Sequence, residues 1–275
     1  MKRGQKNEKE RFSYARPEDP LLKRSAIKAV EQLTGSKQLH KIYLKLQAEG
    51  VSPTLFWGRA LGELSIKADF SEEQLAKIPA SGPLIVIANH PFGIVDGAIL
   101  LDLISRVRSD YFLLINEALA HIPLLQDHLL PVDFRENKLA VKTNLETRRL
   151  TSERLARGQA LAIFPSGGVA TAFRRGGPVE EWPWRKFICS KIHESQCTVV
   201  PIFFHGENSR LFHMVSRMSM NLRLGLLLRE VMNKRGKTIA VTIGDPIPYS
   251  EMAPMRNRQQ LIDLLYQRTM ALQHK

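Results

Sequence analysis

The stretch from Leu84 to Leu100, which reads LIVIANHPFGIVDGAIL, limits the folding of this chain more than any other. It begins with an apolar, largely β-branched run, which is typical of a buried strand. The run stops at His90-Pro91, because proline cannot continue a hydrogen-bonded ladder. Gly93 then permits a tight connection, and an apolar segment of helical type follows Asp96. The stretch therefore predicts a strand, a short loop and a helix, with His90 where the strand ends.

This arrangement places an imidazole and a carboxylate in one loop. Open α/β sheets tend to carry their chemistry at the carboxyl ends of their strands. There, Asp96 bonded to Nδ1–H of His90 would fix the tautomer, and Nε2 would be free to take a proton from a substrate hydroxyl. The pair thus predicts general base catalysis. The alternative is that Asp96 serves only as the cap of the helix.

The residues from Asn89 to Gly97, NHPFGIVDG, resemble the first motif of the glycerolipid acyltransferases of the lysophosphatidate type. The usual spacing in that family is one residue shorter than the five residues that separate His90 from Asp96 here. The longer spacing resembles the haemolysin-like and ornithine-lipid-type branch. The resemblance implies that His90 and Asp96 are catalytic. The further residues of this motif that it implies in loop shape and substrate binding are Asn89, Phe92, Gly93 and Gly97.

Two later segments resemble further motifs of the same family, in the same order. Pro131 to Arg135 resembles the second motif, which implies that Arg135 contacts an anionic group of the acceptor and that Asp133 belongs to the binding set. A surface ion pair is the alternative for Arg135. Val200 to Ile202 resembles the fourth motif, in which a strand ends and lines the acyl site. That resemblance implies substrate binding by Pro201.

The segment from Phe164 to Gly168 stands where the third motif of the family stands, but Ser166 replaces the usual glutamate and Gly168 the usual threonine. Adjacent glycines let backbone N–H groups approach an anion or a thioester oxygen closely. The resemblance implies substrate binding by Pro165, Ser166, Gly167 and Gly168. The lost glutamate favours a lyso-aminolipid acceptor, such as lyso-ornithine lipid, over a glycerol phosphate. A serine hydrolase is not expected, because Phe164 occupies a position where a nucleophile elbow needs glycine.

Strands and helices alternate from Leu84 onward, which predicts an α/β fold with a mostly parallel or mixed sheet flanked by helices. We expect a disordered or loose basic tail over 1–20, an N-terminal helical region over 21–80 and the α/β acyltransferase domain over 81–275. The N-terminal helices either pack on the core or rest on a membrane interface, since periodicity fits both. After the first strand we expect strands at 111–115, 130–134, 159–164, 198–204 and 237–243, and helices at 117–129, 138–157, 186–195 and 258–273.

The excess of Lys and Arg gives a net charge of +13 and a pI of about 9.9, so the chain needs an anionic partner. Nucleic acid is not expected, because no zinc-finger spacing or RRM signature is present. An anionic membrane surface and an acidic acyl-carrier protein both fit the charge. No apolar run approaches the ~18–20 residues that span a bilayer, and the charged N-terminus has no signal-peptide core. We therefore expect a cytoplasmic protein that associates peripherally with the inner face of the membrane.

The resemblance predicts an O-acyltransferase that moves a fatty acyl group from acyl-CoA or acyl-carrier protein to the hydroxyl of a lysolipid acceptor. Beyond that co-substrate we expect no cofactor, and no metal, since the histidines lack a ligand spacing such as HExxH. The alternative function is a non-catalytic basic protein that binds lipid at a membrane surface. The basic, Met- and Leu-rich stretch 208–229 either covers an acyl tunnel, contacts the bilayer or belongs to the core.

Overall fold

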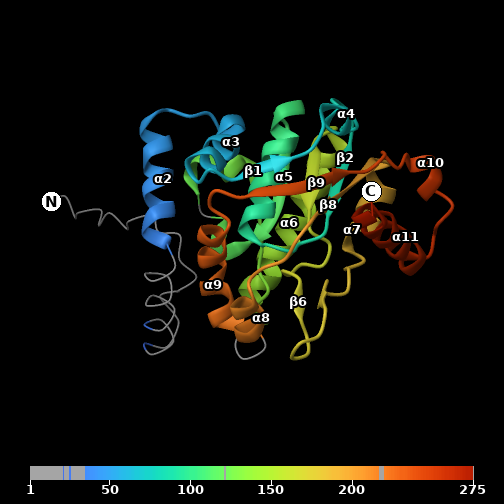
Figure 1. Ribbon diagram of the computed structural model, residues 1–275. Coiled ribbons are helices and arrows are strands. Elements are labelled where there is room, and N and C mark those ends of the chain that lie inside the picture. The colour runs from blue at the N-terminus through green and yellow to red at the C-terminus, as the bar shows by residue number, and fades with distance from the viewer. Residues whose placement is uncertain (1–20, 22–24, 26–34, 121, 217–219, 275) are drawn as a thin grey trace.

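The computed structural model of the protein describes residues 21, 25, 35–120, 122–216 and 220–274 (Figure 1). The expected basic tail over 1–20 lies outside the described residues. So does most of 21–34, where the expected N-terminal helical region begins. Within the described part, no helix is long and apolar enough to cross a membrane.

A seven-stranded sheet runs through the described part of the chain, in the order β1-β9-β8-β2-β5-β3-β4 (Figure 1). Every neighbouring pair is parallel except β8 and β9, which are antiparallel. The predicted α/β class with a mostly parallel sheet is therefore confirmed. The strands are β1 (Lys67–Asp69), β2 (Leu84–Ala88), β3 (Tyr111–Asn116), β4 (Leu129–Val132), β5 (Ala160–Ile163), β8 (Thr198–Phe204) and β9 (Thr238–Ile243).

Both faces of strand β2 are covered by helices. Alternate residues of a strand point to opposite faces, and every residue of β2 is buried. Leu84 and Val86 pack in the core cluster of the first face, and Ile85 and Ile87 in that of the second. This is why the sequence of β2 is a continuous apolar run rather than an alternating one. Helices α2 (Ser36–Ala48), α3 (Pro53–Glu63) and α5 (Ile94–Val107) contribute to the first cluster, and α6 (Lys138–Ala156), α7 (Phe187–Ser195) and α11 (Arg258–Met270) to the second.

The N-terminal region contains a strand as well as helices. We expected only helices over 21–80, but β1 pairs in parallel with β9 and extends the sheet by one strand. Its three residues are too few to show a period in the sequence. The short helix α4 (Glu72–Leu75) follows it, and Ser71 caps that helix by accepting a hydrogen bond from the N–H of Gln74.

One expected helix is wrong. The stretch 117–129 forms two 3-10 helices, η1 (Glu117–Leu119) and η2 (Pro123–His128), instead of one α-helix. Pro123 explains the break, because proline disfavours helical backbone at the residue before it and lacks the N–H of a helical bond. The last expected helix also ends early: α11 stops at Met270, and the 3-10 helix η3 (Ala271–His274) follows.

Several elements absent from the sequence prediction lie near the carboxyl ends of β2, β5 and β8. A small antiparallel hairpin consists of β6 (Thr171–Ala172) and β7 (Val179–Glu180). Two helices, α8 (Arg210–Ser216) and α9 (Met220–Asn233), lie beside each other at the same side of the molecule as this hairpin (Figure 1). Leu226 to Leu228 of α9 are buried, so this part of the stretch 208–229 belongs to the core. The short helix α10 (Tyr249–Met252) precedes α11.

Truncating Ile85 to alanine tests the central strand. Ile85 lies on the strand between β5 and β8, and its side chain is wholly buried in the core cluster of the second face. We therefore expect the free energy of unfolding to fall by about 3 kcal/mol, through lost burial and a residual cavity. The measurement is urea denaturation followed by circular dichroism. Leu139→Ala is the control, since Leu139 is 60% exposed and its loss should cost no more than about 0.5 kcal/mol. Equal losses in the two variants would contradict the assignment of Ile85 to the core.

Candidate active site

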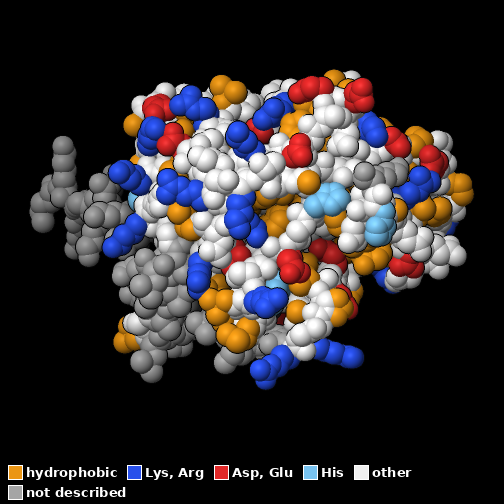
Figure 2. Space-filling view, viewed as in Figure 1, with side chains coloured by type: hydrophobic (Ala, Val, Ile, Leu, Met, Phe, Trp, Pro, Cys, Tyr) orange, Lys and Arg blue, Asp and Glu red, His pale blue; other side chains and the backbone are white. Residues whose placement is uncertain are grey.

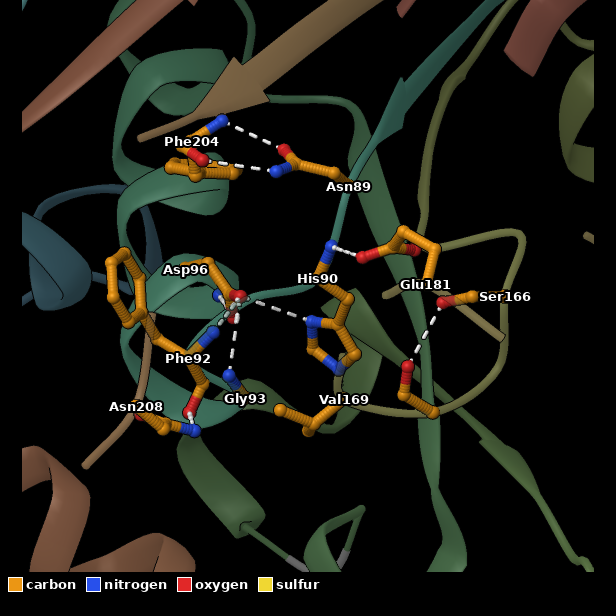
Figure 3. A network of polar contacts seen from close by, with 12 residues as sticks. Asn89, His90, Phe92, Gly93, Asp96, Ser166, Val169, Glu181, Phe204 and Asn208 are labelled. Carbon is orange, nitrogen blue, oxygen red and sulfur yellow. Dashed lines mark hydrogen bonds and ion pairs between the residues drawn. The ribbon is translucent and has the colours of Figure 1, made fainter. Parts of the chain in front are cut away.

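Asn89 ties the end of β2 to the end of β8. Its side-chain amide donates to the backbone oxygen of Phe204 at 2.9 Å, and its side-chain oxygen accepts from the N–H of Phe204 at 2.7 Å (Figure 3). Both hydrogen bonds are buried, so they are strong and their loss would leave unpaired polar groups in the interior. Asn89 therefore fixes where the chain leaves the sheet and where His90 begins, in agreement with its expected part in shaping the loop.

Asp96 is wholly buried, and backbone N–H groups surround its carboxylate. Oδ2 accepts from the N–H of Phe92 at 2.8 Å and of Gly93 at 3.1 Å, and Oδ1 accepts from the N–H of Gly97 at 2.8 Å. Gly93 is the N-cap of α5 and Asp96 is its third residue, so Asp96 caps the helix through a capping box and is not the N-cap residue of the alternative interpretation. The three bonds compensate the burial of a negative charge and hold the loop around it.

The imidazole of His90 lies against this carboxylate. Its Nδ1 is 3.2 Å from Oδ2 of Asp96, within ion-pair distance, although the N–H direction is bent away from an ideal hydrogen bond. Such bonds often tighten only when substrate is bound. Nε2 has no hydrogen-bond partner among the described residues, and the side chain is 16% exposed. The arrangement leaves Nε2 able to accept a proton.

Phe164 was not among the predicted site residues, yet its ring stacks on His90. The two ring centroids are 3.9 Å apart and the planes differ by 21°. Phe164 ends the run of β5 and directly precedes Pro165, so its place in the third motif was the available signal. The ring supports the imidazole on one face and restricts its rotation.

Glu181 was also missed, and it contacts the loop from the other side. It follows strand β7, and its carboxylate accepts the backbone N–H of His90 at 2.7 Å and the Nε1–H of Trp184 at 3.3 Å (Figure 3). Burial raises the pKa of this carboxyl, while the bonds from His90 and Trp184 oppose the rise. A carboxylate is thus present beside Ser166, where the third motif of the family would carry its glutamate. No local pattern could reveal it, since Glu181 is far from His90 in sequence.

The third-motif loop is held by its own backbone. Gly167 adopts a positive φ of 66°, and its N–H donates to the oxygen of Phe164 at 2.9 Å. The hydroxyl of Ser166 is buried and donates to the oxygen of Gly168 at 3.0 Å, so it is not positioned as a nucleophile. The oxygen of Pro165 accepts from the N–H of Arg185 at 2.9 Å. For the N–H of Gly168, the structure shows no hydrogen-bond acceptor in the described ranges.

Arg135 is engaged by a neighbouring carboxylate. Its Nε lies 2.9 Å from both carboxylate oxygens of Asp133, its Nη2 also contacts Asp133, and Glu117 lies 3.9 Å from the same nitrogen. Asp133 is itself buried and exchanges two backbone bonds with the side chain of Asn144. The structure therefore places Arg135 in an ion pair, the second of the two interpretations, and brings neither residue into contact with His90.

Pro201 also lies apart from the imidazole. It stands within β8 rather than at the end of a strand, in register with Ile87 of β2, and its oxygen accepts from the N–H of Gly244 at 2.8 Å. The family motif has its strand end at the proline, whereas here β8 continues to Phe204, as the predicted strand over 198–204 required. His205, the residue after the end of β8, forms a hydrogen bond between its Nε2 and the hydroxyl of Thr242 at 2.8 Å.

Gly93 allows close packing of the loop against α9. It has a φ of 92°, and an added Cβ would lie 2.7 Å from Cδ2 of Leu227 and 3.1 Å from Cγ2 of Val169. Asn208 holds the neighbouring residue, with its amide 3.3 Å from the oxygen of Phe92. Gly97 is less constrained, since its Cβ would be 3.9 Å from Phe164. The loop thus has room for no side chain at Gly93.

A cavity of about 390 Å³ lies beside the backbone of the loop, and its lining is partly acidic. Asn89 and Pro91 border it, together with Glu180, Glu181 and Glu207. The imidazole of His90 is not part of this lining, so the cavity adjoins the site without containing the base.

Metal and thiol chemistry find no support in the described ranges. No group of three or more His, Cys, Asp or Glu side chains there could hold a metal ion. Cys189 and Cys197 are buried, and burial raises the pKa of each thiol to about 11, which leaves little thiolate at neutral pH.

The comparisons with known proteins agree with this geometry. The family model described as Acyltransferase matches residues 60–275. Two relatives are named lyso-glycine lipid O-acyltransferase: one from Phocaeicola vulgatus is 26% identical over 206 residues, 70% of each chain, and one from Bacteroides thetaiotaomicron is 24% identical over 203 residues, 70% of this chain and 72% of the relative. The crystal structure of the 1-acyl-sn-glycerophosphate acyltransferase PlsC from Thermotoga maritima matches 91% of this chain and 87% of that one, with a TM-score of 0.52. At 14% identity this last match shows a shared fold.

Replacing Gly93 with alanine should damage the loop. The positive φ and the overlap with Leu227 predict a loss of about 2 kcal/mol in the free energy of unfolding. Gly62→Ala is the matched control, because Gly62 lies within α3 and an added Cβ meets nothing within 4 Å, so the helix should gain up to about 1 kcal/mol. Thermal and urea unfolding of both variants measure the difference. A neutral Gly93→Ala would contradict the packing described.

Glu181→Gln should change how stability depends on pH. Because burial raises the pKa of Glu181, the unfolded chain ionises first as pH rises, and the folded state loses stability until its own carboxyl ionises. Glutamine removes this titration. The free energy of unfolding of the variant relative to wild type should therefore be higher at about pH 8 than at about pH 4. Urea unfolding at both values measures it, and a difference that falls with pH would contradict the assignment.

Proposed function

This chain belongs to the acyltransferase family, and we propose that it transfers a fatty acyl chain from a thioester to the hydroxyl of a lysolipid. The observation that carries the proposal is the pair formed by His90 and the buried carboxylate of Asp96, with Nε2 of His90 free. Asp96 orients the imidazole and offsets the charge that the imidazole gains when it takes a proton.

The reaction needs a base but no covalent acyl-enzyme, because a thioester is already an activated donor. Nε2 of His90 removes the proton of the acceptor hydroxyl as its oxygen attacks the thioester carbonyl carbon. The tetrahedral intermediate carries a negative oxygen. When it collapses, the carbon–sulfur bond breaks and the imidazolium returns the proton to the leaving thiolate. Products are an ester and a free thiol, with no net proton change.

A backbone N–H group in the third-motif loop is the best candidate donor for the oxyanion. The N–H groups of Gly97 and Gly167 are engaged within the protein, by Asp96 and Phe164. The N–H of Gly168 has no acceptor among the described residues, and Gly168 lies in the loop that begins at Phe164, the ring stacked on His90. A free donor of this kind can stabilise developing charge without reorganisation.

The acceptor in this proposal is an N-acylated amino acid. The two relatives are named for lyso-glycine lipid and for O-acyl transfer. Glycine has no hydroxyl, so an O-acyltransferase acting on such a lipid must acylate a hydroxyl on the N-linked fatty chain. This supports the lyso-aminolipid class that Ser166 favoured, with glycine as well as ornithine among the headgroups. The donor is acyl-CoA or acyl-carrier protein, both anionic and both suited to the charge of +13.

An anionic membrane surface is the proposed location of the acceptor, on the inner face of the membrane. Helix α6 exposes Leu139 and Val141 between Lys138 and Lys142, and Leu145 one turn further on, each about 60% accessible. Apolar side chains among cations are typical of a surface that contacts anionic lipid. Figure 2 shows further Lys and Arg side chains spread over α2 and α3. Helix α6 thus carries lysines and exposed apolar side chains next to each other.

His90→Ala should nearly abolish transfer of a labelled acyl chain from acyl-carrier protein or acyl-CoA to N-(3-hydroxypalmitoyl)glycine. General base catalysis is worth ~10²–10⁴ in rate, and the bonds of Asp96 to the backbone remain, so folding should persist. Asp96→Asn should lose both activity and stability, because an amide cannot accept all three N–H groups. His274→Ala is the control, since His274 is exposed at the end of the chain.

Either of two results would contradict the proposal. One is full activity in His90→Ala. The other is a wild-type protein that transfers nothing yet binds anionic liposomes, which would favour the non-catalytic lipid-binding function.

A further inference from the structure

Arg223 of α9 is a buried cation beside the third-motif loop. Only 3% of its surface is exposed. Its guanidinium carbon lies 5.7 Å from the ring centroids of both Trp182 and Phe212, and its Nη2 donates to the backbone oxygen of Val169. The planar group is thus held by two aromatic rings and one carbonyl, in a fixed orientation.

No carboxylate is paired with Arg223 in the described ranges. Burial alone lowers the pKa of this guanidinium to about 10, with no acidic group to oppose the shift. Removing a charge from water costs several kcal/mol unless a partner compensates. Arg135 differs from Arg223 in this respect, because the carboxylates of Asp133 and Glu117 lie within ion-pair distance of it. Arg223 is therefore a desolvated cation with N–H groups that no described residue accepts.

Arg223 lies close to the catalytic loop. Its acceptor Val169 precedes Ala170, whose N–H donates to the oxygen of His90 at 2.8 Å. In Figure 3 the side chain of Val169 lies on the Nε2 side of the imidazole. Val169 also packs with Phe212, Leu226 and Leu227 in a small apolar cluster separate from the two large cores. A fixed cation and an apolar cluster therefore both contact Val169, the residue whose side chain lies on the Nε2 side of His90.

We propose that Arg223 binds the headgroup carboxylate of the acceptor, an amino acid N-acylated with a hydroxy fatty chain. The inference rests on the proposed function, because it identifies what the acceptor carries beside its hydroxyl. An amino acid acylated on nitrogen keeps its carboxylate, and a guanidinium fork matches a carboxylate with two parallel hydrogen bonds. The fatty chain of the same molecule suits the apolar cluster around Leu226 and Leu227.

Neither the cavity beside the loop nor Arg135 suits the carboxylate of the acceptor as well as Arg223 does. The cavity beside the loop is lined by Glu180, Glu181 and Glu207, which would repel a carboxylate. Arg135, the cation of the second motif, is neutralised by Asp133. A phosphate would satisfy the same guanidinium, so phosphate and carboxylate lipids are separate arms of the test.

The test is calorimetric binding of N-decanoylglycine and its methyl ester to the full chain. Wild type should bind the acid more tightly than the ester. Arg223→Gln should weaken binding of the acid about ten- to hundredfold, as expected for loss of a charge-assisted hydrogen-bonded pair, and leave the ester unchanged. Arg229→Gln is the matched control, since Arg229 lies on the same helix and is exposed.

Three results would overturn the inference. Wild type could bind acid and ester alike, or Arg223→Gln could weaken both alike, which would mean a structural role only. Tight, Arg223-dependent binding of short-chain lysophosphatidate without binding of N-decanoylglycine would assign the site to phosphate. The binding measurement does not depend on acyl transfer. A wild-type protein that binds N-decanoylglycine through Arg223 but transfers no acyl chain would therefore support the Arg223 site and contradict the proposed function.

Arg223→Met separates function from folding. Replacing a buried, uncompensated charge with an apolar side chain is often neutral or stabilising. We expect the variant to keep or raise its midpoint of thermal unfolding while losing its preference for the acid over the ester in binding and in acyl transfer. A lowered midpoint with the acid preference intact would show that Arg223 serves the fold alone.

Discussion

The bonds between one buried carboxylate and three backbone N–H groups hold the whole candidate site together. Without them, Asp96 would be a charge removed from water, which no packing of the surrounding apolar residues could compensate. Because they form, the loop from Phe92 to Gly97 curls around the carboxylate, and the start of α5 is fixed relative to the end of β2. The capping of the helix and the orientation of His90 are therefore two results of one interaction, although the sequence presented them as alternatives.

The strands and the loop around His90 could be predicted because their signals are local. The run from Thr198 to Phe204 is apolar throughout and forms β8 with the expected bounds. Strand β2 also forms where it was expected, and the helix after it is present but begins at Ile94, before Asp96 rather than after it. Elements of two or three residues, such as β6 and β7, have no period to detect, and their existence depends on contacts made after folding. Proline explains the failed helix at 117–129, and its effect could have been read from the sequence.

Charge is the part of the site that motifs predict least well. The motif containing Arg135 suggested a cation for the substrate, but Asp133, two residues away, engages it. The motif containing Ser166 suggested that a carboxylate was absent, but Glu181 brings one from a separate hairpin. In both cases the residue type was plain in the sequence, whereas its electrostatic partner was set by tertiary structure. Similarity to a family therefore predicts which residue types stand in a motif, but not which charged partners they meet in the folded chain.

In the proposed mechanism, the stacking of Phe164 on His90 gives the neutral and the protonated imidazole different electrostatic surroundings. The face of an aromatic ring carries partial negative charge, so it attracts a cation but is nearly indifferent to a neutral imidazole. At a centroid distance of 3.9 Å, the benzene face meets an uncharged ring before proton transfer and a positive one after it. Phe164 thus favours the state that exists only while the tetrahedral intermediate is present. Since the ring directly follows β5, the segment that carries the proposed oxyanion donor would also stabilise the charge that the proposed base gains.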